Sequence, residues 1–135
     1  LVRDLDLGLL MISHDLSVLA TTCDAVAVMY AGRVVEQARQ EDAFSDPRHP
    51  YAEALAAAFP TVGDQRSRHA PSGLLGDPPD PSDLPSGCSF HPRCPLMIDT
   101  CRTVDPALAP AGPGRVAACI RVSADGRRLA PEDVA

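Results

Sequence analysis

Tryptophan is absent from this chain, and aromatic residues make up only 4% of its 135 residues. Apolar residues reach 45%, but alanine supplies much of that share. Proline and glycine are plentiful, with 14 and 9 residues, and they cluster in the second half. Because both residue types interrupt regular elements, we expect the hydrophobic core to lie within residues 1–60.

Positive charge is also scarce. Twelve Lys and Arg residues against eighteen Asp and Glu residues leave a formal net charge of −6. This excludes nucleic acid as the main partner, because binding a phosphate backbone requires a basic face. No apolar run approaches the roughly 18 residues of a membrane-spanning helix, so the sequence predicts no such span.

The chain is organised around an apolar stretch near its start. Residues Gly8–Ile12 are all apolar or small, which is typical of a strand buried on both faces. Asp15 is suited to cap a helix over 15–22, because its carboxylate can accept unpaired backbone N–H groups. His14 is then expected at the carboxyl end of a buried strand, where open α/β sheets place ligand-contacting groups. From its position alone, His14 could equally well be a structural histidine that hydrogen-bonds nearby backbone groups.

Residues 1–59 are predicted to form a compact α/β region. The apolar run Ala25–Tyr30 and the segment Arg33–Gln37 are expected to be strands, joined into a hairpin by a tight turn at Ala31–Gly32. A short helical turn is expected at Glu41–Phe44. Pro50 suits the first position of a further helix, which Pro60 ends.

Two segments are expected to lack regular structure. Residues 60–86 are rich in proline and glycine, and we interpret them as a linker. The polar tail over 123–135 is expected to be disordered. Between these two segments, residues 87–122 form a separate cysteine-rich module in this interpretation.

The module holds four of the five cysteines, at the spacing C-x5-C-x6-C-x17-C: Cys88, Cys94, Cys101 and Cys119. A short segment with little apolar material and four thiols requires a cross-link or a metal. Disulfides are disfavoured, because nothing in the sequence indicates an oxidising compartment. Structural zinc sites usually contain close cysteine pairs, which are missing here, whereas an iron–sulfur cluster tolerates other spacings. The spacing leaves zinc and iron–sulfur equally open.

Two stretches of the first region resemble a known family. The segments Leu9–Leu16 and Ala25–Glu36 are similar to the end of an ABC-transporter nucleotide-binding domain. In that family the residue matching His14 contacts the ATP γ-phosphate, so the resemblance implies a catalytic and ATP-binding role for His14. No G-x-x-x-x-G-K-[ST] phosphate loop, Leu-Ser-Gly-Gly-Gln signature or apolar strand ending in Asp-Glu occurs in this chain. The resemblance therefore covers only the last part of the family's subunit, and the chain alone is expected to be inactive.

Two further phrases narrow the resemblance to the dipeptide and oligopeptide importers. Phe44–Tyr51, with its His-Pro-Tyr end, resembles the start of that branch's C-terminal extension. Gly87–Pro95, Cys101 and Val116–Cys119 resemble its terminal module at each cysteine. In that branch these cysteines are associated with an iron–sulfur cluster, so the resemblance implies a four-iron, four-sulfur (4Fe–4S) cluster, with Zn²⁺ as the alternative.

The resemblance implies the C-terminal fragment of a peptide-importer ATPase subunit. The complete subunit would bind ATP and Mg²⁺, pair with an identical or homologous ATPase subunit, and drive membrane permease subunits served by a peptide-binding protein. Its expected location is the cytoplasmic face of the inner membrane, as a peripheral protein. The alternative function is a non-catalytic metal-binding interaction domain in which His14 has no role.

Overall fold

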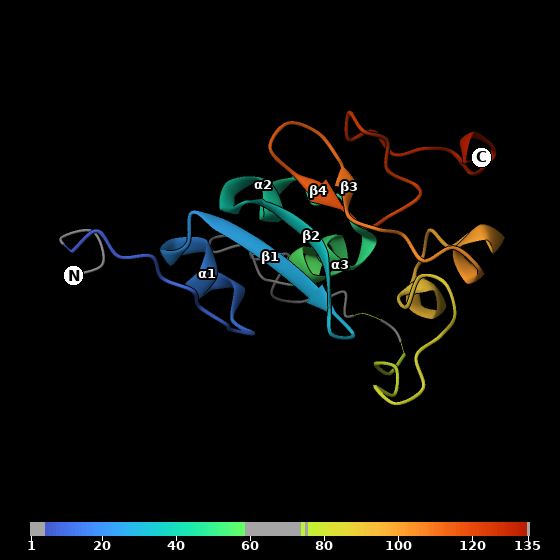
Figure 1. Ribbon diagram of the computed structural model, residues 1–135, viewed down its shortest axis with the longest axis horizontal. Helices are drawn as coiled ribbons and strands as arrows, with labels where there is room; N and C mark the ends of the chain where they lie inside the picture. The colour runs from blue at the N-terminus through green and yellow to red at the C-terminus, as the bar shows by residue number, and fades with distance from the viewer. Residues whose placement is uncertain (1–4, 59–73, 75, 135) are drawn as a thin grey trace.

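An antiparallel sheet of four strands organises the computed structural model, which describes residues 5–58, 74 and 76–134 (Figure 1). The strand order is β1-β2-β4-β3. The two long strands are β1 (Ala25–Tyr30) and β2 (Arg33–Arg39), and the two short ones are β3 (Ala109–Pro110) and β4 (Val116–Ala117). The sheet thus combines strands from both halves of the chain, and β4 lies beside β2 through the pairs Glu36↔Ala117 and Gln37↔Val116.

The β1–β2 hairpin forms as the sequence predicts. In β1 exposed and buried residues alternate strictly, which matches a strand with one face on a core. The turn residues Ala31 and Gly32 both have positive φ, 49° and 76°, the backbone required by the tightest hairpin turns. The predicted strand boundaries are confirmed for β1, and β2 continues two residues beyond the predicted Gln37.

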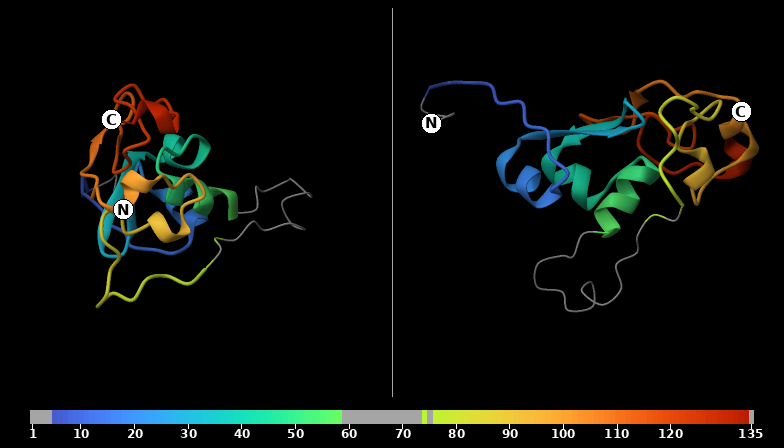
Figure 2. Two further views of the ribbon diagram at one scale, coloured as in Figure 1. Left: turned by 90° about the vertical axis from the view of Figure 1, so that its right-hand side faces the viewer. Right: turned by 90° about the horizontal axis from the view of Figure 1, so that it is seen from below.

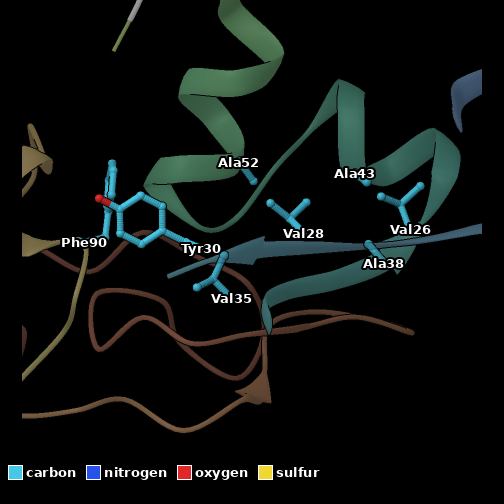
Figure 3. Packing of buried hydrophobic residues seen from close by; sticks show 8 residues of the cluster. All are labelled: Val26, Val28, Tyr30, Val35, Ala38, Ala43, Ala52 and Phe90. Atoms are coloured by element: carbon cyan, nitrogen blue, oxygen red, sulfur yellow. The ribbon is translucent and has the colours of Figure 1, made fainter. Parts of the chain in front are cut away.

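Three α-helices accompany the hairpin: α1 (Leu16–Thr22), α2 (Gln40–Ser45) and α3 (Pro50–Ala58). Ala43 of α2 and Ala52 of α3 face Val26 and Val28 of β1 (Figure 3). Small alanine side chains let both helices approach the sheet closely, and the helices cover one face of the hairpin. The helices predicted after Asp15, near Glu41 and at Pro50 are therefore confirmed.

The core extends beyond residues 1–60. Phe90, which is only 1% exposed, belongs to the same buried cluster as Tyr30 and Val35 (Figure 3). Ala111, Ala117 and Ala118 are also buried. The expectation of a core confined to the first sixty residues is wrong, because a chain this poor in large aromatic groups fills its interior with side chains from both halves.

The strand predicted over Gly8–Ile12 is also wrong. These residues adopt no strand, and the side chains of Leu10 and Ile12 are 91% and 95% exposed. The segment runs away from the sheet (Figure 2). A strand buried on both faces needs hydrogen-bonding neighbours and covering layers, and the described part of the chain places none beside this segment.

The cysteine-bearing region consists of loops and short 3₁₀ helices, η1 (His91–Arg93) and η2 (Asp99–Arg102). Most of the segment predicted as a linker, residues 60–73 and 75, lies outside the described residues. Residues 123–134, predicted to be disordered, have a defined conformation with a bridge between Val122 and Arg128 and a final 3₁₀ helix, η3 (Pro131–Asp133). In residues 5–58, 74 and 76–134, no helix has both the length and the apolar character needed to cross a membrane.

Candidate functional site

The four predicted cysteines line one pocket. It has a cavity volume of about 20 Å³, and its wall also includes His49, Phe90 and His91. All four thiols are free: Cys88, Cys94, Cys101 and Cys119. The structure therefore brings together residues that span 32 positions of sequence, as the prediction of a shared ligand set requires.

Backbone hydrogen bonds hold all four cysteines in place. The Cys119 carbonyl accepts Val122 N at 3.1 Å, and the other three cysteines donate through their own N–H groups. Cys88 N donates to the Cys101 carbonyl at 3.0 Å, Cys94 N to the His91 carbonyl at 3.2 Å, and Cys101 N to the Ile98 carbonyl at 2.9 Å. Gly87 makes this approach possible, because its φ is +68° and a Cβ there would lie 2.5 Å from the Cys101 carbonyl oxygen. The Nδ1 of His91 lies 2.9 Å from the Cys88 carbonyl oxygen, which ties this side chain to the same loop.

Three of the thiols, those of Cys88, Cys94 and Cys119, lie in an environment that favours their neutral form. Burial raises the pKa of Cys88 and of Cys119, and it raises the pKa of Cys94 to about 11. The neighbouring cysteines act in the same direction, since each thiolate disfavours another. Four thiolates together in this pocket would repel one another, and a bound cation would offset that repulsion.

The donor set suits a soft metal or an iron–sulfur cluster, since thiolate is the preferred ligand of both. Within the described ranges, however, no three His, Cys, Asp or Glu side chains form a group that could hold a metal ion. The chemistry of the four thiols therefore leaves both occupants open, a zinc ion or an iron–sulfur cluster.

His49 in the wall of this pocket is a buried histidine, and it is hydrogen-bonded to a buried carboxylate, that of Glu36. Glu36 and His49 are each 1% exposed. The Glu36 carboxylate accepts Arg48 N through both oxygens at 3.0 Å and His49 N at 2.7 Å. These N–H groups precede α3 and would otherwise be unpaired, so Glu36 anchors the start of that helix to β2.

The His49 side chain makes contacts on two sides. Its Nδ1 accepts Tyr51 N at 3.1 Å, and the ring also hydrogen-bonds the Ala118 backbone. Burial lowers the pKa of His49 to about 4, so the ring is neutral at physiological pH. The pKa of Glu36 is raised, chiefly by burial, against the lowering effect of its N–H donors and of Arg115 and Arg48.

Aromatic rings connect this pair to the cysteine segment. The Phe90 ring centroid lies 5.1 Å from that of Tyr30, 5.4 Å from Tyr51 and 5.7 Å from His49. Phe90 sits between Cys88 and Cys94 in sequence, so its insertion fixes that loop on the hairpin and α3. The helix predicted to begin at Pro50 is confirmed, and Tyr51 in its first turn packs against Tyr30 and Phe90.

Sequence reasoning missed the central role of Glu36 and the burial of His49. One signal was available for Glu36, because it is an acidic residue that directly follows Val34 and Val35 in a predicted strand. A charge in a strand is ordinarily placed on the solvent face. Its partners lie 12 and 13 residues away and are backbone groups, which no side-chain pattern can reveal.

His14 lies elsewhere. Its side chain is exposed, and it directly precedes the α1 cap, where Asp15 accepts Ser17 N at 2.9 Å. The hydrogen bonds from Ser17 lower the pKa of Asp15, which keeps the cap ionised. The end of the molecule that carries α1 is opposite the end that carries η1 and η2 (Figures 1 and 2). The structure does not bring His14 together with the four cysteines.

Comparison with known proteins gives one family match. The family described as "Oligopeptide/dipeptide transporter, C-terminal region" matches residues 35–101. This range includes Glu36, His49 and the first three cysteines of the pocket, while His14 and Cys119 lie outside it.

Curated relatives match over a longer range. A putative peptide import ATP-binding protein of Brucella ovis is 46% identical over 90% of this chain and 39% of the relative. A probable peptide ABC transporter ATP-binding protein of Sinorhizobium fredii is 44% identical over the whole chain and 38% of the relative. The oligopeptide transport ATP-binding protein OppD of Salmonella typhimurium is 40% identical over 90% of this chain and 35% of the relative. The chain thus spans less than half the length of the relatives it matches.

Proposed function

This chain belongs to the oligopeptide/dipeptide transporter C-terminal-region family, and from that premise we propose that it is the C-terminal part of a peptide importer's ATP-binding subunit. The observation that carries the proposal is the identity of 40–46% to proteins named as peptide import or oligopeptide transport ATP-binding proteins. The alternative, a non-catalytic metal-binding interaction domain, does not account for similarity that continues through residues before the cysteines.

In this proposal the complete subunit binds ATP with Mg²⁺ and pairs with an identical or homologous subunit. It acts on membrane permease subunits from the cytoplasmic face of the membrane, and peptide reaches the permease through a separate binding protein. The phosphate loop and the magnesium ligands are not in this sequence. We therefore expect no ATP hydrolysis from the 135-residue chain alone.

His14 is the residue of this chain that we place at the nucleotide. Its side chain is exposed and directly precedes the Asp15 cap of α1, so it is accessible to a phosphate supplied by the rest of the subunit. A ring N–H directed at the γ-phosphate would stabilise the charge of the transferred group and orient the attacking water. Positioning of this kind is most of what a protein contributes to phosphoryl transfer.

The test of this role is His14→Ala in the full-length subunit. ATP hydrolysis should fall about a hundredfold or more, because the contact acts in the transition state, while the Kd for nucleotide should change little. Steady-state phosphate release and equilibrium nucleotide binding measure the two effects. Arg127→Ala, which removes a side chain in an exposed ion pair with Asp125, is the control and should hydrolyse ATP normally. Equal turnover of His14→Ala and wild type would make His14 structural.

We also propose that the four cysteines hold a 4Fe–4S cluster with a structural role, with zinc as the alternative occupant. The support is their common pocket and the preference of iron–sulfur clusters for four thiolate ligands. A structural role follows from the surroundings, because ATP hydrolysis transfers no electrons. When bound, the cluster would join loops that have few apolar contacts of their own.

Cys94→Ser tests the cluster. Wild-type protein purified without oxygen should be brown, with iron and sulfide in equal amounts and broad visible absorption that fades on chelation. The variant should lose this colour, and proteolysis should cut residues 87–120 faster while residues 25–58 stay protected. Cys23→Ser, at the C-cap of α1, is the matched control and should keep the colour. Colourless wild type with stoichiometric zinc and no iron would identify zinc as the occupant.

A further inference from the structure

Cys119 differs from the other three cysteines in what holds it. Cys88, Cys94 and Cys101 lie in the loops and 3₁₀ turns of residues 87–102, which bond mainly to one another. Cys119 comes after a gap of 17 residues and lies two positions beyond the last residue of β4. Its distance from the other thiols therefore depends on how β4 is seated against the rest of the molecule.

The residue before Cys119 is fixed through both of its backbone groups. Ala118 N donates to the Val35 carbonyl of β2 at 2.8 Å. His49 supplies the second contact, and its tautomer follows from geometry: Nδ1 accepts Tyr51 N and so carries no proton, which leaves Nε2–H as the donor. The Ala118 carbonyl is the group that can accept it.

His49 is itself held rigidly. Glu36 accepts its backbone N–H at 2.7 Å, the Phe90 ring packs against its imidazole, and the side chain is 1% exposed. His49 also lines the cysteine pocket. A rigid side chain that bonds the backbone next to a ligand sets where that ligand points, as the outer groups of metal sites commonly do.

We propose that His49 is a positioning residue for Cys119, and that its Nε2–H bond to the Ala118 carbonyl aims the Cys119 thiol into the four-cysteine pocket. The placement of the thiol stands on the geometry of this chain alone, and its consequence for a bound cluster rests on the proposed function. Through Glu36 and His49, the start of α3 and Cys119 would then be linked in one structural unit.

Two substitutions separate the contacts of His49. His49→Asn keeps a side-chain acceptor at the position of Nδ1, which can still bond Tyr51 N, but is too short to reach Ala118. His49→Gln keeps a donor at about the distance of Nε2. Val28→Ala, which opens a hole in the same core away from Cys119, is the control for general destabilisation.

The first measurement is the rate at which iodoacetamide modifies each cysteine in the metal-free full chain, read by peptide mass spectrometry, with Cys101 as internal reference. His49→Asn should raise the Cys119 rate relative to Cys101 about tenfold, the effect expected from losing one buried hydrogen bond. His49→Gln should restore the ratio to within about twofold of wild type. Val28→Ala should lower the unfolding midpoint and leave the ratio unchanged.

The proposal is overturned if His49→Asn reacts as wild type does, or if Val28→Ala raises the ratio as much as His49→Asn. It is overturned as well if His49→Gln is no better than His49→Asn, since His49 would then act only by packing. The second measurement is visible absorption after anaerobic iron and sulfide loading, where His49→Asn should shift or weaken the spectrum and His49→Gln should recover it. Failure of wild type to load would reject the cluster, while the alkylation ratios would still decide the role of His49.

Discussion

The hairpin with its two helices, residues 25–58, and the cysteine-bearing region, residues 87–122, are built in different ways. The first has regular elements with alternating burial and its own apolar contacts between β1, α2 and α3. The second has two-residue strands and 3₁₀ turns, and its large buried side chain, Phe90, inserts into the core of the first. Residues 25–58 therefore form most of the hydrophobic core, and residues 87–122 are held in place by packing against that core.

The difference shows how a segment rich in turns acquires a defined shape. Phe90 inserts at one side of the cysteine loops, β4 adds to the free edge of β2, and His49 bonds the backbone beside Cys119. Arginines make further ties, such as Arg115, which pairs with Asp42 and Asp46 on α2 and its C-cap. Stability of the cysteine region should accordingly respond most to changes at these few points.

Phe90→Ala should have the largest effect, because it empties the space between three aromatic rings. Truncating a fully buried phenylalanine costs about 3–5 kcal/mol. The free energy of unfolding from urea titration should fall by about this amount, and hydrogen exchange should rise over 87–122 more than over 25–58. Leu108→Ala, in the same region but 42% exposed, is the control and should cost little. An equal rise in hydrogen exchange over both regions would mean that each depends on Phe90 to the same extent, which would contradict the prediction.

Acid should weaken the contact between the regions through His49. Its pKa is about 4 when folded and near 6.5 when unfolded, so the unfolded chain binds more protons between these values. The free energy of unfolding should therefore decrease as pH falls from 6.5 to 4, by about 3 kcal/mol in total. Glu36, with its raised pKa, acts in the opposite direction. The pH dependence of wild type minus that of His49→Gln isolates the histidine, and identical profiles would contradict the prediction.

Gly87→Ala should lower the free energy of unfolding least among the three predictions. Its loss should still exceed that of the control substitution Gly114→Ala. Gly87 and Gly114 have nearly equal φ, +68° and +67°, but a Cβ at Gly87 would meet the Cys101 carbonyl while nothing lies within 4 Å at Gly114. Gly114→Ala should cost about 1 kcal/mol from backbone strain, and Gly87→Ala about 2 kcal/mol or more. Thermal and urea unfolding measure the difference. Equal losses would show that the loops around Cys88 and Cys101 can separate freely.

The sequence predicted correctly those strands, turns and helix starts that depend on interactions between residues close in the chain. The alternation in Ala25–Tyr30, the positive-φ turn at Ala31–Gly32, the Asp15 cap and the proline at the start of α3 each act over a few residues. The apolar run Gly8–Ile12 shows where this reasoning fails. Apolar character indicates that a segment is suited to burial, but the strand forms only when a neighbouring strand pairs with it.

The candidate site divides along the same line. Its four cysteines could be named from their number, their spacing and the family resemblance, because chemistry resides in residue types. The sequence could not predict that the four cysteines converge on one pocket. It also could not predict the burial of Glu36 or the role of His49, because both depend on backbone groups from distant parts of the chain.

The sequence by itself determined the family, the hairpin, the helix starts and the four thiols, because each rests on residue identity or on contacts between near neighbours. Tertiary structure decided that β4 joins β2, that Phe90 fills the core of the first region, and that Glu36 and His49 are buried. The physical reason is that these features arise from pairings between distant segments. Their free energy comes from excluding water between surfaces that no stretch of sequence contains alone.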